Sequence, residues 1–150
     1  GHKFSVRLNG TSDLSPKLFN VNGVNVLDKF SNTMFYDYTK IFNRMNMTSE
    51  NYHLTFSFSG SNMNEVVQAL DNGYNVAVPF LVGKNDTLPN EFLGFDVSDA
   101  DETDLRFLDT LRIAGLRVKI TKDREAIQTA VSKGFVIDPN NFDIEKTKVA

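Results

Sequence analysis

The stretch Tyr52-His53-Leu54-Thr55-Phe56-Ser57-Phe58-Ser59 decides the fold, because its apolar and polar residues alternate strictly. Such alternation is typical of a half-buried strand, whose successive side chains point to opposite faces of a sheet. The period then changes: Asn62 and Glu65 resemble a capping box, and an apolar stripe follows as far as Gly73. The apolar run 75–82 is typical of a buried strand. We therefore expect a strand–helix–strand unit with parallel strands.

Further elements are expected on both sides of this unit. Residues 4–8 and 34–40 alternate in the same way, and shorter apolar runs indicate strands at 92–97, 115–120 and 135–137. Helices are expected at 15–19 and at 123–133. Pro79 indicates that the strand over 75–82 carries a bulge or lies at a sheet edge, because proline cannot donate to a strand partner.

The alternation also limits the fold class. Strands covered by helices on both faces read as continuous apolar runs, whereas here one face of several strands carries Arg, Asn, Ser and Thr. We predict an α/β fold with an open, barrel-like, mainly parallel sheet, helices on one face and a polar concave face. An α+β fold with an antiparallel sheet gives the same alternation and stays open as the alternative.

The length and composition suit a single α/β domain over residues 1–150, expected to be a fragment of a longer protein with a flexible tail at 138–150. The chain has no Cys, which excludes disulfides, thiolate metal sites and cysteine nucleophiles. A net charge of −3 gives no global attraction to nucleic acid or anionic lipid. No apolar run approaches the ~20 residues of a membrane helix, so we expect no membrane partner and a cytoplasmic location.

The segment 96–109 is the densest polar stretch, with six carboxylates and Arg106 in fourteen residues. Asp99, Asp101 and Asp104 have the hard oxygen ligands that suit Mg²⁺ or Mn²⁺, and such an ion would leave coordination positions for phosphate. The alternative is a solvated acidic turn that uses Asp in local turns and caps. Arg106 can pair with a carboxylate and order the segment.

Two further clusters fall at the expected carboxyl ends of strands. Ser59, Ser61 and Asn62 surround a glycine turn whose free N–H groups suit a phosphate, although an ordinary capped turn explains them as well. Arg7 and Asn9 suit an anionic substrate, with a structural Arg–Asp pair as the alternative. The full set of candidates for ligand binding is Asn9, Thr11, Ser12, Asp13, Asp37, Lys40, Ser59, Ser61, Asn62 and Arg106.

Several segments together resemble a family of uncharacterised phage, prophage and plasmid proteins. The matching pieces are Arg7-Leu8-Asn9-Gly10-Thr11-Ser12-Asp13, Phe35-Tyr36-Asp37-Tyr38-Thr39-Lys40, Asn51-Tyr52-His53-Leu54-Thr55-Phe56-Ser57, Asn75-Val76-Ala77-Val78 and Asp99-x-Asp101-x-x-Asp104-Leu105-Arg106-Phe107-Leu108-Asp109. They keep their order over most of residues 4–137, and imply an origin in a mobile element within a host cell rather than a mechanism.

The chain departs from this family at three positions. Ala100 and Thr103 replace a glycine and a histidine of the acidic loop, and Ile120 replaces a glycine after the matching Lys119. The family is also distantly similar to truncated radical-enzyme barrels. Because the chain has no Cys, iron–sulfur chemistry is not available to it, and no haem is expected.

We therefore expect a phosphate-bearing ligand on the polar face, with Mg²⁺ or Mn²⁺ as a further expectation. An enzyme would carry out metal-assisted phosphoester chemistry, with Asp99, Asp101 and Asp104 as ligands and Arg7 or Lys119 steadying the phosphate. The alternative is a non-catalytic interaction module for a host protein or nucleic acid, with the acidic segment as its docking surface. A basic patch of Lys40, Arg44, Lys119 and Lys122 would serve nucleic acid, but nothing in their spacing brings them together, so scattered surface charge is the favoured explanation.

Overall fold

The computed structural model describes residues 4–118 and 124–142. The strands are β1 (Ser5–Arg7), β2 (Asn20–Val21), β3 (Val24–Asn25), β4 (Met34–Thr39), β5 (Tyr52–Ser57), β6 (Val76–Phe80), β7 (Glu91–Phe92), β8 (Phe95–Asp99) and β9 (Ile113–Arg117). The α-helices are α1 (Val26–Lys29), α2 (Met63–Asp71) and α3 (Arg124–Ser132), with 3₁₀ turns at Pro16–Leu18, Phe42–Met47 and Arg106–Leu108. The predicted short helix at 15–19 is the first of these turns.

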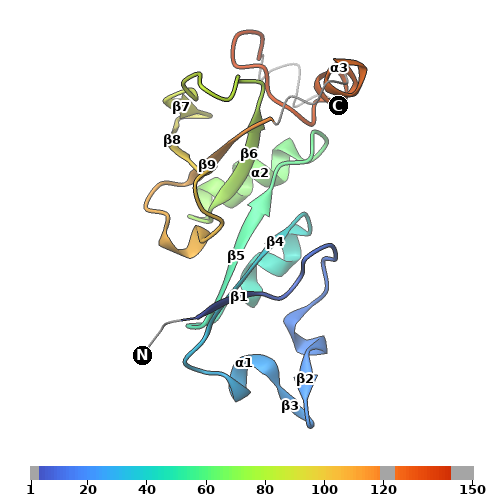
Figure 1. The fold of residues 1–150 in the computed structure, drawn as a ribbon, viewed down its shortest axis with the longest axis vertical. Coiled ribbons are helices and arrows are strands. Elements are labelled where there is room, and N and C mark those ends of the chain that lie inside the picture. Colours follow the sequence, from blue (N-terminus) through green and yellow to red (C-terminus); the bar gives the residue numbers. More distant parts are fainter. Residues whose placement is uncertain (1–3, 119–123, 143–150) are drawn as a thin grey trace.

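Within the described ranges, seven strands form one sheet in the order β1-β4-β5-β6-β9-β8-β7 (Figure 1). Every neighbouring pair is parallel except β7 with β8. The prediction of an open, mainly parallel α/β sheet is confirmed, and within this sheet antiparallel pairing occurs only in that edge hairpin. A separate antiparallel pair, β2 with β3, lies at the far end of the molecule.

The unit β5–α2–β6 is the parallel strand–helix–strand predicted from the alternation. Helix α2 packs its buried side chains, Val66 and Leu70 among them, into the same core as the apolar residues of β5 and β6. It is followed by Gly73 at φ +80°, a conformation that favours glycine. Asn62 does precede the helix, but the predicted capping box is wrong, because its side chain makes no bond to the helix.

The side chain of Asn62 closes the preceding turn instead. Its Oδ1 accepts from the Ser59 N–H at 2.8 Å, and its Nδ2 donates to the Ser57 carbonyl at 3.0 Å. A carboxamide can both donate and accept, so both polar atoms of Asn62 are used in this turn and neither is left to cap the helix.

Pro79 lies in a central strand rather than at an edge, so that prediction is wrong. β6 stands between β5 and β9, and it pairs with β5 only at Val76 and Ala77. Beyond Ala77, Ile137 lies beside β6 in place of β5 and donates its N–H to the Pro79 carbonyl at 2.9 Å. A proline is tolerated here because nothing requires its missing N–H.

Three other strand predictions need correction. The run 92–97 is two strands, β7 and β8, joined by a tight turn in which Leu93 and Gly94 both have positive φ. The strand expected at 115–120 begins earlier, at Ile113, and residues 119–120 lie outside the described part. Residues 135–137 make a single bridge, from Ile137 to Phe80.

The two faces of the sheet differ, although not as predicted for β4. In the alternation of residues 34–40, Asp37 and Thr39 mark the polar side of the strand; in the structure they lie on the covered face, beside buried Phe35. Polar side chains can face a core when their hydrogen bonds are satisfied, as those of Asp37 are. The open face carries Tyr36 and Tyr38 of β4.

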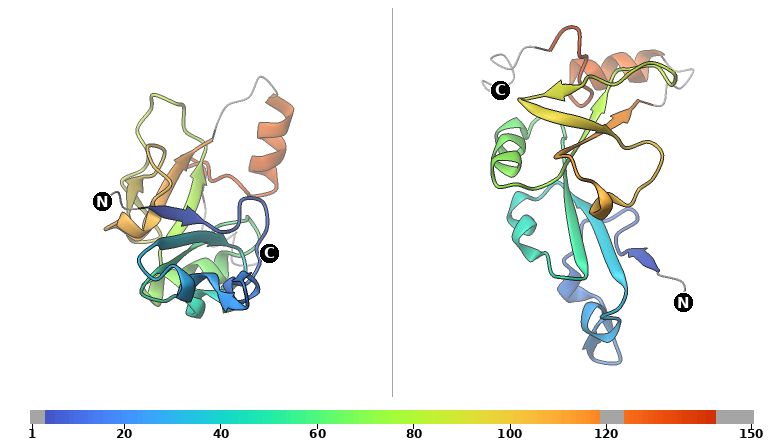
Figure 2. Two further views of the ribbon diagram at one scale, coloured as in Figure 1. Left: turned by 60° about the horizontal axis from the view of Figure 1, so that its bottom comes forward. Right: turned by 90° about the vertical axis from the view of Figure 1, so that its left-hand side faces the viewer.

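The open face is partly covered by the segment 100–112, which joins β8 to β9 (Figure 2). In the right-hand view of that figure, α2 lies on one side of the sheet and this segment on the other. Phe107 packs on Tyr36 with ring centroids 5.9 Å apart. Among the residues described, no helix is long and apolar enough to cross a membrane. The predicted flexible tail at 138–150 lies mostly outside the described residues.

Candidate functional site

A pocket of about 560 Å³ lies where β1, β4, β5 and β9 end, and we call it the carboxyl-end pocket. Sites in open parallel sheets gather at this end of the strands. Its lining combines cations, carboxylates and hydroxyls: Arg7, Gly10, Thr11, Ser12, Asp13, Tyr38, Thr39, Lys40, Ser57, Asp104 and Leu116. Six predicted site residues therefore meet here: Arg7, Thr11, Ser12, Asp13, Lys40 and Asp104.

The loop that follows β1 forms one wall, and buried Asn9 holds it in shape. The Asn9 N–H and Nδ2 donate to the two carboxylate oxygens of Asp37 at 2.7 and 2.8 Å. Its Oδ1 accepts from the Ser12 hydroxyl at 2.7 Å and from the Leu14 N–H at 3.1 Å. Every polar atom of this carboxamide is therefore used inside the protein, so Asn9 shapes the loop rather than facing the pocket.

Asp37 is equally enclosed, being 1% exposed. Besides Asn9, its carboxylate accepts from the Tyr52 hydroxyl at 3.0 Å, and that hydroxyl accepts from Arg44 at 3.1 Å. Burial, followed by the charge of Asp37, raises the pKa of Tyr52 well above its usual range. Asp37 is therefore placed to support the site from behind and does not line the pocket.

Asp13 fixes the other end of the loop to β4. Its carboxylate accepts from the Thr39 hydroxyl at 2.9 Å and from the Lys40 N–H at 3.0 Å. It is also ion-paired with the buried guanidinium of Arg44. Because Arg44 is 4% exposed, it belongs to this internal network and is not available to the predicted basic patch.

Between these two anchors, residues 10–13 face the pocket with unused donors. Within the described part of the chain, the backbone N–H groups of Gly10, Thr11, Ser12 and Asp13 donate no hydrogen bond. Gly10, Thr11 and Ser12 are exposed. Successive free N–H groups in a fixed loop are a common feature of anion sites.

Arg7 and Tyr38 hold Asp104 at the opposite wall. The Tyr38 hydroxyl donates to one carboxylate oxygen at 2.5 Å, and Arg7 donates to the other at 3.2 Å. The Arg7 guanidinium also stacks over the Tyr38 ring, 4.8 Å from its centroid. Burial, with the hydrogen bond to Asp104 next, raises the pKa of Tyr38 well above its usual range. The phenol therefore stays protonated and keeps donating to Asp104.

Lys40 contributes a cation without a carboxylate partner in the described ranges. Its Nζ lies 5.3 Å from the centre of the Phe135 ring, a cation–π distance. The other charges of the lining are paired: Arg7 with Asp104, and Asp13 with Arg44 behind the wall. The pocket therefore carries one uncompensated positive charge.

The three carboxylates expected to bind a metal do not converge. Asp99 and Asp101 both bond Arg117, at 2.7 and 2.8 Å, whereas Asp104 points to Arg7 and Tyr38. The bond from Arg117 lowers the pKa of Asp99. Among the described residues, no group of three or more His, Cys, Asp or Glu is placed to hold an ion.

Arg106 orders the acidic segment from within, in agreement with the prediction that it pairs with a carboxylate of this segment. It is 1% exposed, donates to the Thr103 carbonyl and lies 3.0 Å from Asp109. Burial raises the pKa of Asp109 above its usual value, with Arg106 opposing the shift. This guanidinium is therefore not exposed to the carboxyl-end pocket.

Ser59, Ser61 and Asn62 are outside the lining of that pocket, although they follow β5. The turn they form packs closely on the end of α3: a Cβ added to Gly60 would lie 2.8 Å from backbone atoms of residues 133–135.

Lys119, the remaining predicted catalytic residue, lies outside the described residues, as does Lys122.

Sequence reasoning missed five residues of the lining and the supporting residue Tyr52; the five are Gly10, Tyr38, Thr39, Ser57 and Leu116. Ser57 does carry a signal, since it lies on the polar side of an alternating strand near its carboxyl end. Tyr38 does not, because Asp37 and Thr39 mark the other side of its strand as the polar one. Tyr52 carries none, because a tyrosine at the start of a strand reads as core until its hydroxyl is seen to bond Asp37.

The fold and this pocket define an α/β protein with a polar site at the carboxyl ends of parallel strands. Over residues 1–139 the chain matches the family model described as gene product 88, and it belongs to that family. This agrees with the phage-type family expected from the sequence motifs. Searches of curated proteins and of solved structures give no significant match.

Proposed function

We propose that this protein binds a phosphate-bearing ligand in the carboxyl-end pocket. The observation that carries the proposal is the juxtaposition of the unused N–H groups of residues 10–13 with Lys40. A phosphate has acceptor oxygens for several N–H donors and a negative charge for one cation. Both requirements are present on adjacent walls of the same pocket.

The buried network supports a binding role for the loop. Asn9, Asp13 and Asp37 use their polar atoms to fix residues 10–13 on β4, so the donors at the rim are positioned before any ligand arrives. Preorganised donors bind more tightly, because little conformational freedom is lost on association. The open-face hydroxyls of Ser57 and Tyr38 extend the polar surface around the same space.

The proposal includes neither a metal nor a reaction. With Asp99 and Asp101 bonded to Arg117 and Asp104 held elsewhere, the described residues give no support to a site for Mg²⁺ or Mn²⁺. Metal-assisted phosphoester chemistry stays a prediction from the sequence. The interaction module for a host protein or nucleic acid stays one as well, although the acidic side chains it would use are partly neutralised by Arg117 and Arg7.

The test compares Lys40→Ala with the wild-type protein in thermal unfolding against inorganic phosphate and nucleotides. A ligand that binds only the folded state raises the unfolding midpoint by mass action. We expect a rise in the wild-type protein that is much reduced in Lys40→Ala, because the uncompensated cation is gone.

Lys29→Ala is the matched control, since Lys29 is exposed and lies outside the pocket. Phosphate also stabilises proteins through exclusion from their surface, and that effect raises all three midpoints equally. Equal rises in the three proteins, or none in the wild type, would contradict the proposal.

A further inference from the structure

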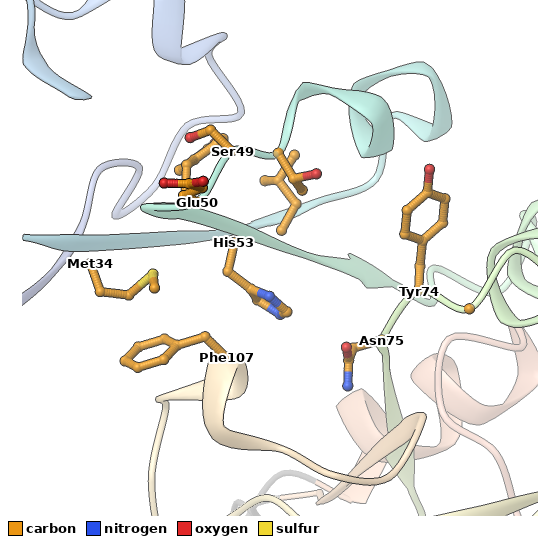
Figure 3. Close-up of a pocket in the computed structure, with 11 residues that line it drawn as sticks. Met34, Ser49, Glu50, His53, Tyr74, Asn75 and Phe107 are labelled. Carbon is orange, nitrogen blue, oxygen red and sulfur yellow. The ribbon is translucent and has the colours of Figure 1, made fainter. Parts of the chain in front are cut away.

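A second pocket lies at the opposite end of β5, in a gap of the sheet. β5 begins at Tyr52, but β6 joins it only from Phe56, so the first four residues of β5 have no partner in β6. A cavity of about 300 Å³ occupies this position, and Figure 3 shows it. We call it the amino-end pocket; its lining includes Met34, Glu50, His53, Leu54, Asn75 and Phe107.

Two polar side chains enter the amino-end pocket with unused hydrogen-bonding atoms. Nε2 of His53 is buried and has no hydrogen-bond partner among the described residues. Asn75 donates its Nδ2 to the Leu111 carbonyl at 3.0 Å, which orients the carboxamide and leaves its Oδ1 without a donor in the described part. In Figure 3 both side chains point into the space between β5 and the start of β6. A buried polar atom left unpaired is costly, so a ligand that pairs it gains that energy.

The other walls combine apolar residues with the hydroxyl-bearing residues Thr48, Ser49 and Tyr74, and they carry little charge. Phe107 approaches from the segment 100–112, opposite β5, and its ring is held by Tyr36. Met34 and Leu54 add aliphatic surface, and Glu50 is the one charged residue of the lining in the described ranges. Burial lowers the pKa of His53, so its imidazole is neutral at neutral pH. An anionic group is therefore disfavoured, and an uncharged, flat ligand with a polar edge fits best.

We propose that the amino-end pocket binds an uncharged nitrogen heterocycle of the nucleobase type, with its edge on His53 and Asn75 and its face toward Phe107. The volume lies at the lower end of the range for small-molecule sites, ~300–1,000 Å³, as suits a single ring system. The site shares no lining residue with the carboxyl-end pocket. From His53 to Ser57 the strand rises ~13 Å, so the two sites are separate and this inference does not depend on the phosphate proposal.

The test is an NMR titration of the full chain with adenosine, guanosine, cytidine and uridine, which carry no phosphate. We expect at least one nucleoside to give saturable shifts at residues 48–54, 73–75 and 107. In His53→Phe, which keeps a ring but removes the nitrogen, binding should weaken about tenfold, the effect of one hydrogen bond of ~1.4 kcal/mol.

Phe107→Leu is a second variant, which removes the aromatic face from a different element and should also weaken binding. Lys40→Ala is the control and should bind the nucleoside like the wild type. The result for the nucleoside therefore stands even if the carboxyl-end pocket binds no phosphate. The inference is overturned if no nucleoside shifts these residues, or if the affinity is the same in His53→Phe, Phe107→Leu and the wild type.

Discussion

At the scale of single residues, the most consequential feature is the buried polar network behind the carboxyl-end pocket. It contains two carboxylates, Asp13 and Asp37, and one cation, Arg44, joined by Asn9 and the hydroxyl of Tyr52. Buried charges are tolerated when they are paired and hydrogen-bonded, and removing one partner leaves another group unsatisfied. The stability of the loop that forms the pocket wall therefore depends on individual atoms.

Tyr52→Phe tests this dependence by removing one oxygen atom. The hydroxyl donates to Asp37 and accepts from Arg44, so its loss should lower the free energy of unfolding by about 1–3 kcal/mol. Tyr36→Phe is the matched control: within the described residues its hydroxyl makes no hydrogen bond, and the change should stay within about 0.5 kcal/mol. Chemical denaturation measures both, and equal effects would show that the network contributes nothing.

At the scale of elements, the glycine turn after β5 matters more for packing than for ligand binding. Gly60 has φ +87°, and it lies against the backbone that follows α3. The sequence predicted this turn correctly, but it could not show that a segment more than seventy residues away packs on it, because a glycine gives no signal for its tertiary neighbours.

Gly60→Ala should therefore destabilise the protein for two reasons, a positive φ and a close contact. The left-handed conformation costs a residue with a Cβ about 1–2 kcal/mol, and an atom forced against fixed backbone adds about 1–3 kcal/mol. Gly94→Ala separates the two, because Gly94 has φ +81° but open space around its Cα. Thermal or denaturant unfolding should show the larger loss in Gly60→Ala. Equal losses would exclude the packing contribution.

At the scale of the whole molecule, the sequence predicted the parallel sheet and the end of it where polar residues gather. Alternation revealed β1, β4 and β5, and the change of period revealed α2. It could not reveal which face of β4 is covered, because Asp37 and Thr39 read as solvent-facing until Asn9 and Asp13 are seen to satisfy them. Nor could it place the acidic segment, whose carboxylates are directed by Arg7 and Arg117 from other strands.

The surroundings of His53 and Asp99 in the folded state predict how the stability of the molecule depends on pH. Burial holds the pKa of His53 below its unfolded value of about 6.5, so above that value both states are neutral and pH has no effect through this residue. As the pH falls below 6.5, His53 takes up a proton in the unfolded state but stays neutral in the folded state, so the free energy of unfolding decreases. Asp99, whose folded pKa is lowered by Arg117, acts with the same sign but only below its usual value near 3.8.

Denaturant unfolding between pH 7 and pH 5 should therefore show a loss of stability in the wild-type protein that is smaller in His53→Phe. The two proteins should run parallel again at lower pH, where Asp99 takes up its proton in both. Asp109, whose folded pKa is raised by burial, is present in both proteins, so the difference between them isolates the imidazole. An identical pH dependence in the two proteins would show that His53 takes up a proton as readily in the folded state as in the unfolded state. The imidazole would then be more hydrated than its buried Nε2 indicates.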